Sequence, residues 1–301
     1  MKSLFRKVFV VSAAGVGLLV LPAHAQVAPA ATPTPIQPAA ATMTAGTESS
    51  EDFTVRLGAF FLSSINTKLA LSDSAGHGGQ EVDLSRDLGI RDSLNVFRLD
   101  AEWRFAGKHK VQFAYFDINR STSHVLTGSI NWGDQTYPVN ATVSAQFRTT
   151  IYKLNYGYTF YQNETNTQEI SGLIGFHITG MKASISGAIA GVTSGVEGAS
   201  ITAPLPVFGL EWKSRLSDKL SSYVAYEYFG LSLDNKYTGN LSDFQAMLEY
   251  HVGRNWSLGA GYNRYTSRAT VTSGQTASGN QLKLALRHDY NGLMLFVSTS
   301  F

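Results

Sequence analysis

The sequence predicts an all-β chain, a transmembrane antiparallel up-and-down β-barrel of about ten strands, with eight or twelve as the alternative counts. Segments of roughly ten residues alternate apolar and polar side chains with a period of two, which is the periodicity of a strand. Turn residues or polar loops separate these segments. Charged residues make up only 15% of the chain and aromatic residues 12%, and there are 28 glycines. This composition fits a barrel with aromatic girdles better than a water-soluble globule.

Residues 1–25 have the pattern of a signal peptide. Lys2, Arg6 and Lys7 precede an apolar stretch, and Ala23-His24-Ala25 forms a cleavage site. An uncleaved membrane anchor is the alternative. Removing the segment takes away three positive charges from the 24 Lys and Arg, which leaves 21 against 22 Asp and Glu. The mature chain therefore offers no basic surface for nucleic acid, and we expect no nucleic-acid partner.

Residues 26–52 are rich in Ala, Pro and Thr and carry almost no bulky side chains, so they predict a disordered linker. A tether to peptidoglycan is the alternative. The chain has no cysteine, so an exported protein of this sequence cannot rely on disulfides. Residues 53–301 are predicted to form the barrel.

The first strands are predicted from Phe53 onward. Residues 53–61 alternate between apolar and polar or small side chains, although Phe60 and Leu62 place apolar side chains on the second face as well. Residues 97–105 place Phe, Leu, Ala and Trp on one face and four charged side chains on the other, which indicates a strand between lipid and lumen. The chain turns at residues 106–109 and returns from Val111, where the faces are ambiguous because Phe113 and Phe116 cannot share one.

The next strands are predicted to extend beyond the membrane. The returning strand runs to Ile130, turns at residues 131–134, and comes back through residues 137–147 before crossing to Phe160. A strand at 170–186 follows, and Pro204 and Pro206 predict a bulge or irregular start in the strand that ends near 216. The remaining strands are predicted at 224–232, 244–252, 256–272 and 281–301. Residues 281–289 extend the last strand or form a separate strand, split at Asn291-Gly292.

The last ten residues, Gly292 to Phe301, alternate in the same way and end on an aromatic residue. This stretch resembles the closing strand of Gram-negative outer-membrane β-barrels, in which a terminal Phe or Trp is part of the signal read by the assembly machinery. The resemblance implies that Phe301 is an assembly signal. It also implies export through the inner membrane to the outer membrane, with residues 26–52 as a periplasmic linker. The implied partners are outer-membrane lipid, lipopolysaccharide and the barrel assembly machinery.

The connections between strands predict the orientation. Those after Phe105, Tyr161, Leu216 and Val252 are short, and those after Leu71, Ile130, Ser186, Ser232 and Thr272 are longer. Short turns face the periplasm and long loops face outward in such barrels. An even strand number places both ends of the barrel domain on the periplasmic side.

The side chains predicted to face the lumen carry balanced charge. They are Arg56, Arg98, Asp100, Glu102, Arg104, Lys153, Glu211, Lys213, Glu227, Glu249 and His251. Without His251 they are five cations and five anions, whereas a selective pore shows a ring of one sign. Side chains fill barrels of about eight strands, and wide channels need about sixteen. We therefore expect a salt-bridged, largely plugged barrel, with a narrow water-filled pore as the alternative.

The histidines do not predict a catalytic site. His177 and His251 face the lumen, and Glu249 shares the face of His251, but no nucleophile accompanies them. His288 and Asp289 are neighbours on a strand, so their side chains point to opposite faces. We expect no catalytic residue, no metal and no cofactor.

The expected function is that of a structural outer-membrane barrel or a narrow porin-like conduit for small solutes. The overall pattern from Phe53 to Phe301 resembles exported barrel proteins of the porin-like group, and no motif points to a narrower family. One alternative is a barrel enzyme that hydrolyses lipid or peptide. Another is a surface adhesin or receptor that uses the hairpin 121–147 and the loop 72–93.

Overall fold

The structure is a computed structural model that describes residues 9–10, 52–73, 81–132, 135–189, 192–193, 197–233, 237–275 and 281–301. The predicted signal peptide and linker lie outside the described residues, apart from residues 9–10 and 52. No helix in these ranges is long and apolar enough to cross a membrane.

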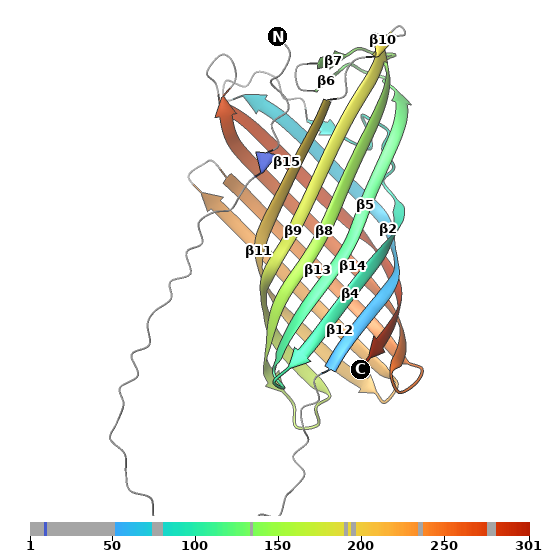
Figure 1. Cartoon of the computed structure of the whole chain (residues 1–301), viewed down its shortest axis with the longest axis vertical. Helices are drawn as coiled ribbons and strands as arrows, with labels where there is room; N and C mark the ends of the chain where they lie inside the picture. Colours follow the sequence, from blue (N-terminus) through green and yellow to red (C-terminus); the bar gives the residue numbers. More distant parts are fainter. Residues whose placement is uncertain are drawn as a thin grey trace, which may run out of the picture.

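Ten antiparallel strands close into one barrel (Figure 1). Each strand pairs with its neighbour along the chain, and the last pairs with the first to close the ring. The strands are β2 (Asp52–Asp73), β4 (Leu94–Phe105), β5 (His109–Val125), β8 (Thr142–Gln162), β9 (Gln168–Ile189), β11 (Glu197–Ser217), β12 (Leu220–Leu233), β13 (Tyr237–His251), β14 (Trp256–Gln275) and β15 (Gln281–Ser300). The predicted barrel of ten strands is thus confirmed, and the alternatives of eight and twelve are wrong.

Short strands accompany the barrel. Strand β3 (Val82–Asp83) pairs with β2, and β10 (Val192–Thr193) folds back on β9. Strands β6 (Ile130–Trp132) and β7 (Gln135–Tyr137) form a separate hairpin. Strand β1 (Phe9–Val10) lies parallel to residues 201–202 of β11.

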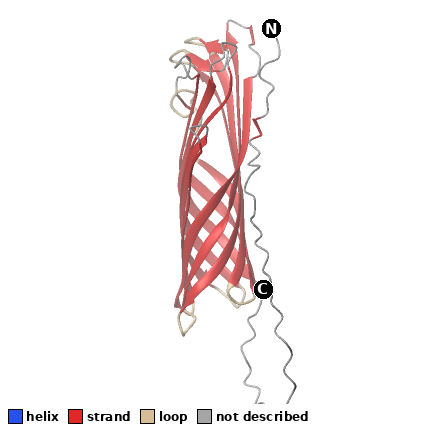
Figure 2. Cartoon of the chain, turned by 90° about the vertical axis from the view of Figure 1, so that its left-hand side faces the viewer, coloured by secondary structure: helices blue, strands red, loops and turns tan. Residues whose placement is uncertain are grey.

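Strands such as β2 and β9, each of 22 residues, are longer than the roughly ten residues that cross a bilayer. The turns and described loops gather at the two ends of the barrel (Figure 2). The end with short turns carries residues 106–108, 163–167 and 218–219. In the first of these, Ala106 and Gly107 both have positive φ, 47° and 73°, which glycine tolerates best. Asp52 and the carboxy-terminus lie at this same end, because the backbones of Phe53 and Phe301 hydrogen-bond to each other. The predicted placement of both ends on one side agrees with this geometry.

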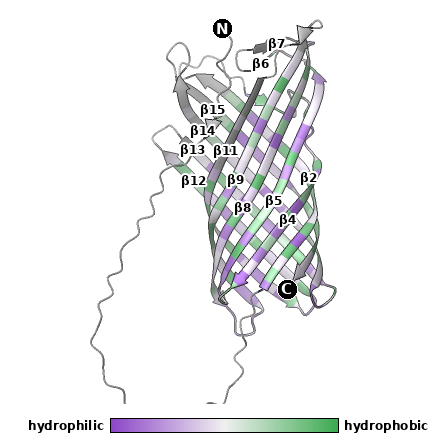
Figure 3. Cartoon of the chain, viewed as in Figure 1, coloured by the Kyte–Doolittle hydropathy of each residue, from purple (hydrophilic) through white to green (hydrophobic). Residues whose placement is uncertain are grey.

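Hydrophobic and hydrophilic residues alternate along the strands (Figure 3), so one face of each strand is apolar and the other faces the interior. Large apolar side chains on the outer face remain exposed, among them Leu154, Phe176, Leu210, Tyr226, Leu258 and Leu295. Their neighbours in sequence point inward and are buried. The ambiguity at Phe113 and Phe116 is resolved by this rule, because Phe116 is fully buried in the interior and Phe113 lies on the outer side.

The outer hairpin between β5 and β8 differs from the prediction of continuous strands through residues 121–147. Strand β5 ends at Val125 and β8 begins at Thr142, so the predicted run to Ile130 is wrong. Pro138 has no N–H for a ladder, and Asn140 adopts a positive φ of 66°. The chain is instead tied by the amide of Leu126, which donates to the carbonyl of Ala141, and by the amide of Asn140, which donates to the carbonyl of Leu126.

The last strand is continuous from Gln281 to Ser300, so residues 281–289 extend it rather than forming a separate strand. Its register against β2 shifts between Asn291 and Gly292. Ser63 is the extra residue on β2, and its hydroxyl donates to Asn291 Oδ1 at 2.8 Å. The predicted break is therefore a local bulge within one strand.

Pro204 and Pro206 do not produce the predicted bulge. Strand β11 pairs with β9 from Glu197 to Ser214 without a shift in register. On its other side, however, the pairing with β12 stops at Phe208 and Tyr228. The prolines therefore mark the end of a strand pairing rather than a bulge.

Candidate functional site: the charged and aromatic lumen

Charged side chains cross the lower half of the lumen, toward the short-turn end of the barrel. Strand β4 places Arg98, Asp100, Glu102 and Arg104 on its inner face, because they occupy alternate positions. The other predicted members come from five strands: Arg56 on β2, Lys153 on β8, Glu211 and Lys213 on β11, Glu227 on β12, and Glu249 and His251 on β13. Each charged member lies in an ion pair of at most 3.5 Å.

Many of these pairs join distant strands. The inter-strand pairs are Arg56–Glu249 (2.5 Å), Lys213–Glu102 (2.5 Å), Lys110–Glu169 (2.6 Å), Lys110–Glu211 (2.5 Å), Arg104–Glu169 (2.7 Å), Lys153–Glu227 (2.7 Å) and Lys153–Asp243 (2.8 Å). Strands β8 and β13 are four steps apart around a ring of ten, so the Lys153–Asp243 pair spans almost the full width of the barrel. The same separation holds for Lys213 on β11 and Glu102 on β4. These pairs therefore bridge the lumen rather than lining its wall.

Three members of this network were not predicted. Lys110, Glu169 and Asp243 each have the parity of the inward residues on their own strand, so alternation could have found Glu169 and Asp243, whereas the faces of the Lys110 strand were ambiguous in the sequence. They were missed because the predicted strands began one residue later, at Val111, Ile170 and Phe244. Adding Lys110 to the five predicted cations, and the two acids to the five predicted anions, changes the balance in this layer to six cations and seven anions.

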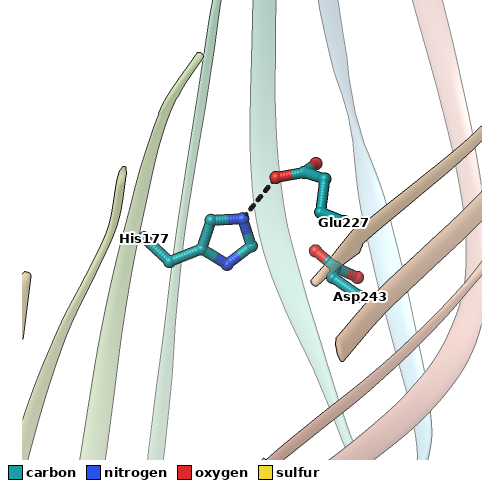
Figure 4. A group of neighbouring side chains, drawn as sticks. All are labelled: His177, Glu227 and Asp243. Carbon is teal, nitrogen blue, oxygen red and sulfur yellow. Dashed lines mark hydrogen bonds and ion pairs between the residues drawn. The ribbon is translucent and has the colours of Figure 1, made fainter. Parts of the chain in front are cut away.

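His177, Glu227 and Asp243 form a compact group in which the possible ligand atoms lie within 4.8 Å of one another (Figure 4). Nε2 of His177 lies 2.6 Å from a carboxylate oxygen of Glu227. A histidine and two carboxylates are chemically able to bind a divalent metal. The ammonium of Lys153, however, donates to both carboxylates, so it supplies the positive charge that such a group requires.

His251 lies apart from this group. Its two ring nitrogens each lie 2.8 Å from a serine hydroxyl, Ser221 on one side and Ser257 on the other. Serine hydroxyls thus occupy both ring nitrogens, and within the described part of the chain no carboxylate orients the ring as a hydrolytic triad requires. His288 is buried in the interior, whereas Asp289 pairs with Arg287, so the two neighbours face opposite sides as their spacing predicts.

An aromatic layer lies against the charged layer. Phe60, Phe116, Tyr265 and Tyr290 are buried and pack ring against ring, with Tyr265 and Tyr290 stacked at 4.7 Å between centroids. The guanidinium of Arg98 joins the two layers. It pairs with Asp100 at 2.8 Å and lies 5.2 Å from the centroid of the Phe116 ring.

The loop after β2 packs over the opposite end of the interior from the short turns. Leu84, Leu88 and Ile90 are buried in an apolar cluster with side chains of β8, β9 and the 126–141 connection. The loop is held internally by Asp83, whose carboxylate accepts from the amides of Ser85 and Arg86 at 3.0 Å. Partial burial raises the pKa of Asp87, but hydrogen bonds from Arg86 and the Asp83 amide outweigh it and hold that pKa below its usual value.

A cavity of about 30 Å³ remains among the charged side chains. It is lined by Arg56, Asp100, Glu102, Lys153 and Tyr223, among others. This volume suits about one or two water molecules. It does not accommodate a solute.

No family model and no curated protein sequence matches the chain. Among solved structures it is similar to the outer membrane protease OmpT from Escherichia coli, at 11% identity and a TM-score of 0.46, over 82% of this chain and 97% of that one. The outer membrane protein OprG from Pseudomonas aeruginosa shows 13% identity and a TM-score of 0.38, over 83% and 96%. The translocator domain of autotransporter NalP from Neisseria meningitidis shows 12% and 0.40, over 83% and 88%.

The class of the protein follows from its own geometry. The strands close into a ring, so the backbone of the spanning part is paired, and the outer belt is apolar while the interior is charged, as a chain that crosses lipid requires. The chain has the fold of a transmembrane β-barrel.

Proposed function

We propose that the protein is a sealed structural barrel of the Gram-negative outer membrane, rather than a conduit for solutes. The observation that carries this proposal is the set of ion pairs that join nearly opposite walls, above all Lys213–Glu102 and Lys153–Asp243. A buried charge is costly without a partner, so breaking these pairs to admit a solute is unfavourable.

The aromatic layer and the packed outer loop support the same proposal, because they add two further obstacles along the axis of the barrel. Export by a cleaved signal peptide fits the amino-terminal sequence. Partnership with outer-membrane lipid, lipopolysaccharide and the assembly machinery fits the closing strand. A small solute would be a partner only if the axis opened.

Conductance of the purified protein in planar bilayers tests the proposal. We expect no single-channel steps from the unaltered protein. Arg98→Ala combined with Glu102→Ala removes two central side chains, and we expect this variant to conduct. The matched control is Asp117→Ala with Arg148→Ala, which removes an ion pair on the outer face. Regular steps from the unaltered protein would favour the narrow pore instead.

We also propose that the protein has no catalytic activity. The support is the environment of its lumenal histidines. His177 contacts the Glu227 carboxylate, which also accepts from the Lys153 ammonium, and His251 lies between two serine hydroxyls. Hydrolysis of a lipid or peptide substrate that is lost in His177→Ala, His251→Ala or His288→Ala would overturn this proposal.

A further inference from the structure

The pairing between β11 and β12 is interrupted partway up the barrel wall. Strands β11 and β12 pair from Ser217 and Leu220 up to Phe208 and Tyr228, and no further. Strand β11 continues to pair with β9, and β12 with β13, beyond this point. The upper ends of β11 and β12 thus separate, as Figure 1 shows. We call the gap between residues 203–207 and residues 229–233 the notch.

Two prolines explain where the pairing ends. Successive residues of a strand direct their N–H groups to opposite neighbours. Because the pairing with β9 is unbroken, the ring nitrogens of Pro204 and Pro206 face the β12 side, where they have no hydrogen to donate. After Phe208 and Tyr228, the next ladder positions would pair Pro206 with Gly230 and Pro204 with Ser232. Both prolines lack the N–H donor that these ladder positions need, so the sequence itself encodes the notch.

The notch lies at the outer boundary of the membrane. A strand crosses the hydrocarbon region in roughly ten residues, and Phe208 lies about that far from the lower end of β11 at Ser217. Phe208 and Tyr228 both point outward and are exposed, as expected for the aromatic girdle at a membrane surface. Unpaired backbone is tolerated here, because headgroups and water supply hydrogen-bonding partners that the hydrocarbon lacks.

Apolar side chains line the inner side of the notch. Val207 and Phe229 are buried members of the main apolar cluster, and Leu205 packs against it. Leu231 has the inward parity of Phe229, yet it is 40% exposed because no β11 residue pairs across from it. An apolar surface therefore continues from the outside of the barrel to the aromatic layer.

We propose that the notch is a side entrance that takes the acyl chain of an outer-leaflet lipid against the inner face of the barrel. Its height matches the membrane surface, its lining is apolar, and its β11 edge presents the carbonyls of Pro204 and Pro206 to headgroup donors. This inference is independent of the sealed axis, because the charged layer lies below the notch.

Photolabelling in lipid nanodiscs tests the proposal. The probe is a phosphatidylcholine with a diazirine in its acyl chain, and the labelled residues are mapped by mass spectrometry. We expect adducts on the inward residues Leu205, Phe229 and Leu231, in addition to the outward residues Leu210 and Tyr226. Pro204→Val with Pro206→Val restores both N–H donors, so the inward labelling should be lost while the outward labelling stays.

The map of the unaltered protein decides the question even if the proline variant fails to fold. Adducts confined to outward residues would overturn the proposal, whether the notch is shut or filled by another segment of the chain. Inward labelling that persists in a folded proline variant would also overturn it. Neither result depends on whether the barrel conducts ions.

Discussion

The ammonium of Lys110 on β5 lies 2.5 Å from a carboxylate oxygen of Glu211 on β11, and neither side chain exposes any surface. The same ammonium lies 2.6 Å from Glu169 on β9. This lysine thus bridges two buried acids from two strands, which Arg104 and Lys213 also contact at 2.7 and 3.5 Å. A buried ion pair is weak evidence of net stabilisation, but removing one partner leaves an uncompensated charge.

Replacing Lys110 by methionine should therefore destabilise the barrel by about 3–5 kcal/mol. Urea unfolding in phospholipid vesicles, followed by tryptophan fluorescence, measures the change. Adding Glu211→Gln should recover part of this loss, because it removes one of the two buried negative charges that lose the Lys110 ammonium. Arg148→Met is the matched control on the exposed outer face, where loss of an ion pair costs less than about 1 kcal/mol. Equal effects of the two single variants would contradict the bridging role of Lys110.

A glycine inside the barrel offers a second test of packing. A Cβ added at Gly259 would collide with the ring of Phe296, whose Cζ and Cε2 atoms lie against this position. Gly259→Ala should cost about 1–3 kcal/mol, the usual cost of overpacking a core. Gly253→Ala is the control, since a Cβ there meets nothing within 4 Å. A neutral effect of Gly259→Ala in the same unfolding assay would show that the Phe296 ring moves freely.

Strand alternation made most of the barrel predictable, because one face must meet lipid and the other must not. Arg98 and Glu102 could be assigned to the lumen from their spacing alone. Their partners could not be, because alternation fixes the direction of a side chain and not which distant strand it meets. The bridge from Glu102 to Lys213 depends on how the ring closes.

Local exceptions to the pattern were harder to interpret. Pro206 signalled an irregularity, but only the pairing on both sides of β11 shows that it ends one ladder and leaves the other intact. Lys110 was missed because its strand was predicted to begin at Val111, and because the apolar residues Phe113 and Phe116 left the faces of that strand unassigned. The buried position of Phe116 depends on its contacts with Phe60 and Tyr290, which lie far away in sequence.

The outer loop should loosen in acid. The pKa of Asp87 lies below its usual value in the folded loop, so its charged form stabilises the loop above about pH 4, and this contribution is lost as the pH falls further. Hydrogen exchange of the Gly89 and Ile90 amides, which bond to Ser85 and Leu84, reports on the loop. Their protection factors should fall with the pH in the unaltered protein and respond less in Asp87→Asn. Identical profiles for both proteins would assign the loosening to another group.

Substitution of the carboxy-terminal residue, Phe301, can distinguish an effect on stability from an effect on assembly. The backbone of Phe301 donates to Phe53 and accepts from it, whereas the residue as a whole is 71% exposed. Phe301→Ala keeps both hydrogen bonds, so the purified variant should refold into detergent with an unfolding free energy within about 0.5 kcal/mol of the unaltered protein, as is usual for surface changes.

In cells the same variant should reach the outer membrane in smaller amounts, because the terminal aromatic side chain is expected to serve as the assembly signal. Heat-modifiable migration of folded barrel in outer-membrane fractions measures this yield. Phe301→Trp is the matched control and should restore it, since an aromatic residue is retained. If Phe301→Ala accumulates normally in the outer membrane, the Phe301 side chain is not an assembly signal. If it also fails to refold in detergent, the side chain acts on stability instead.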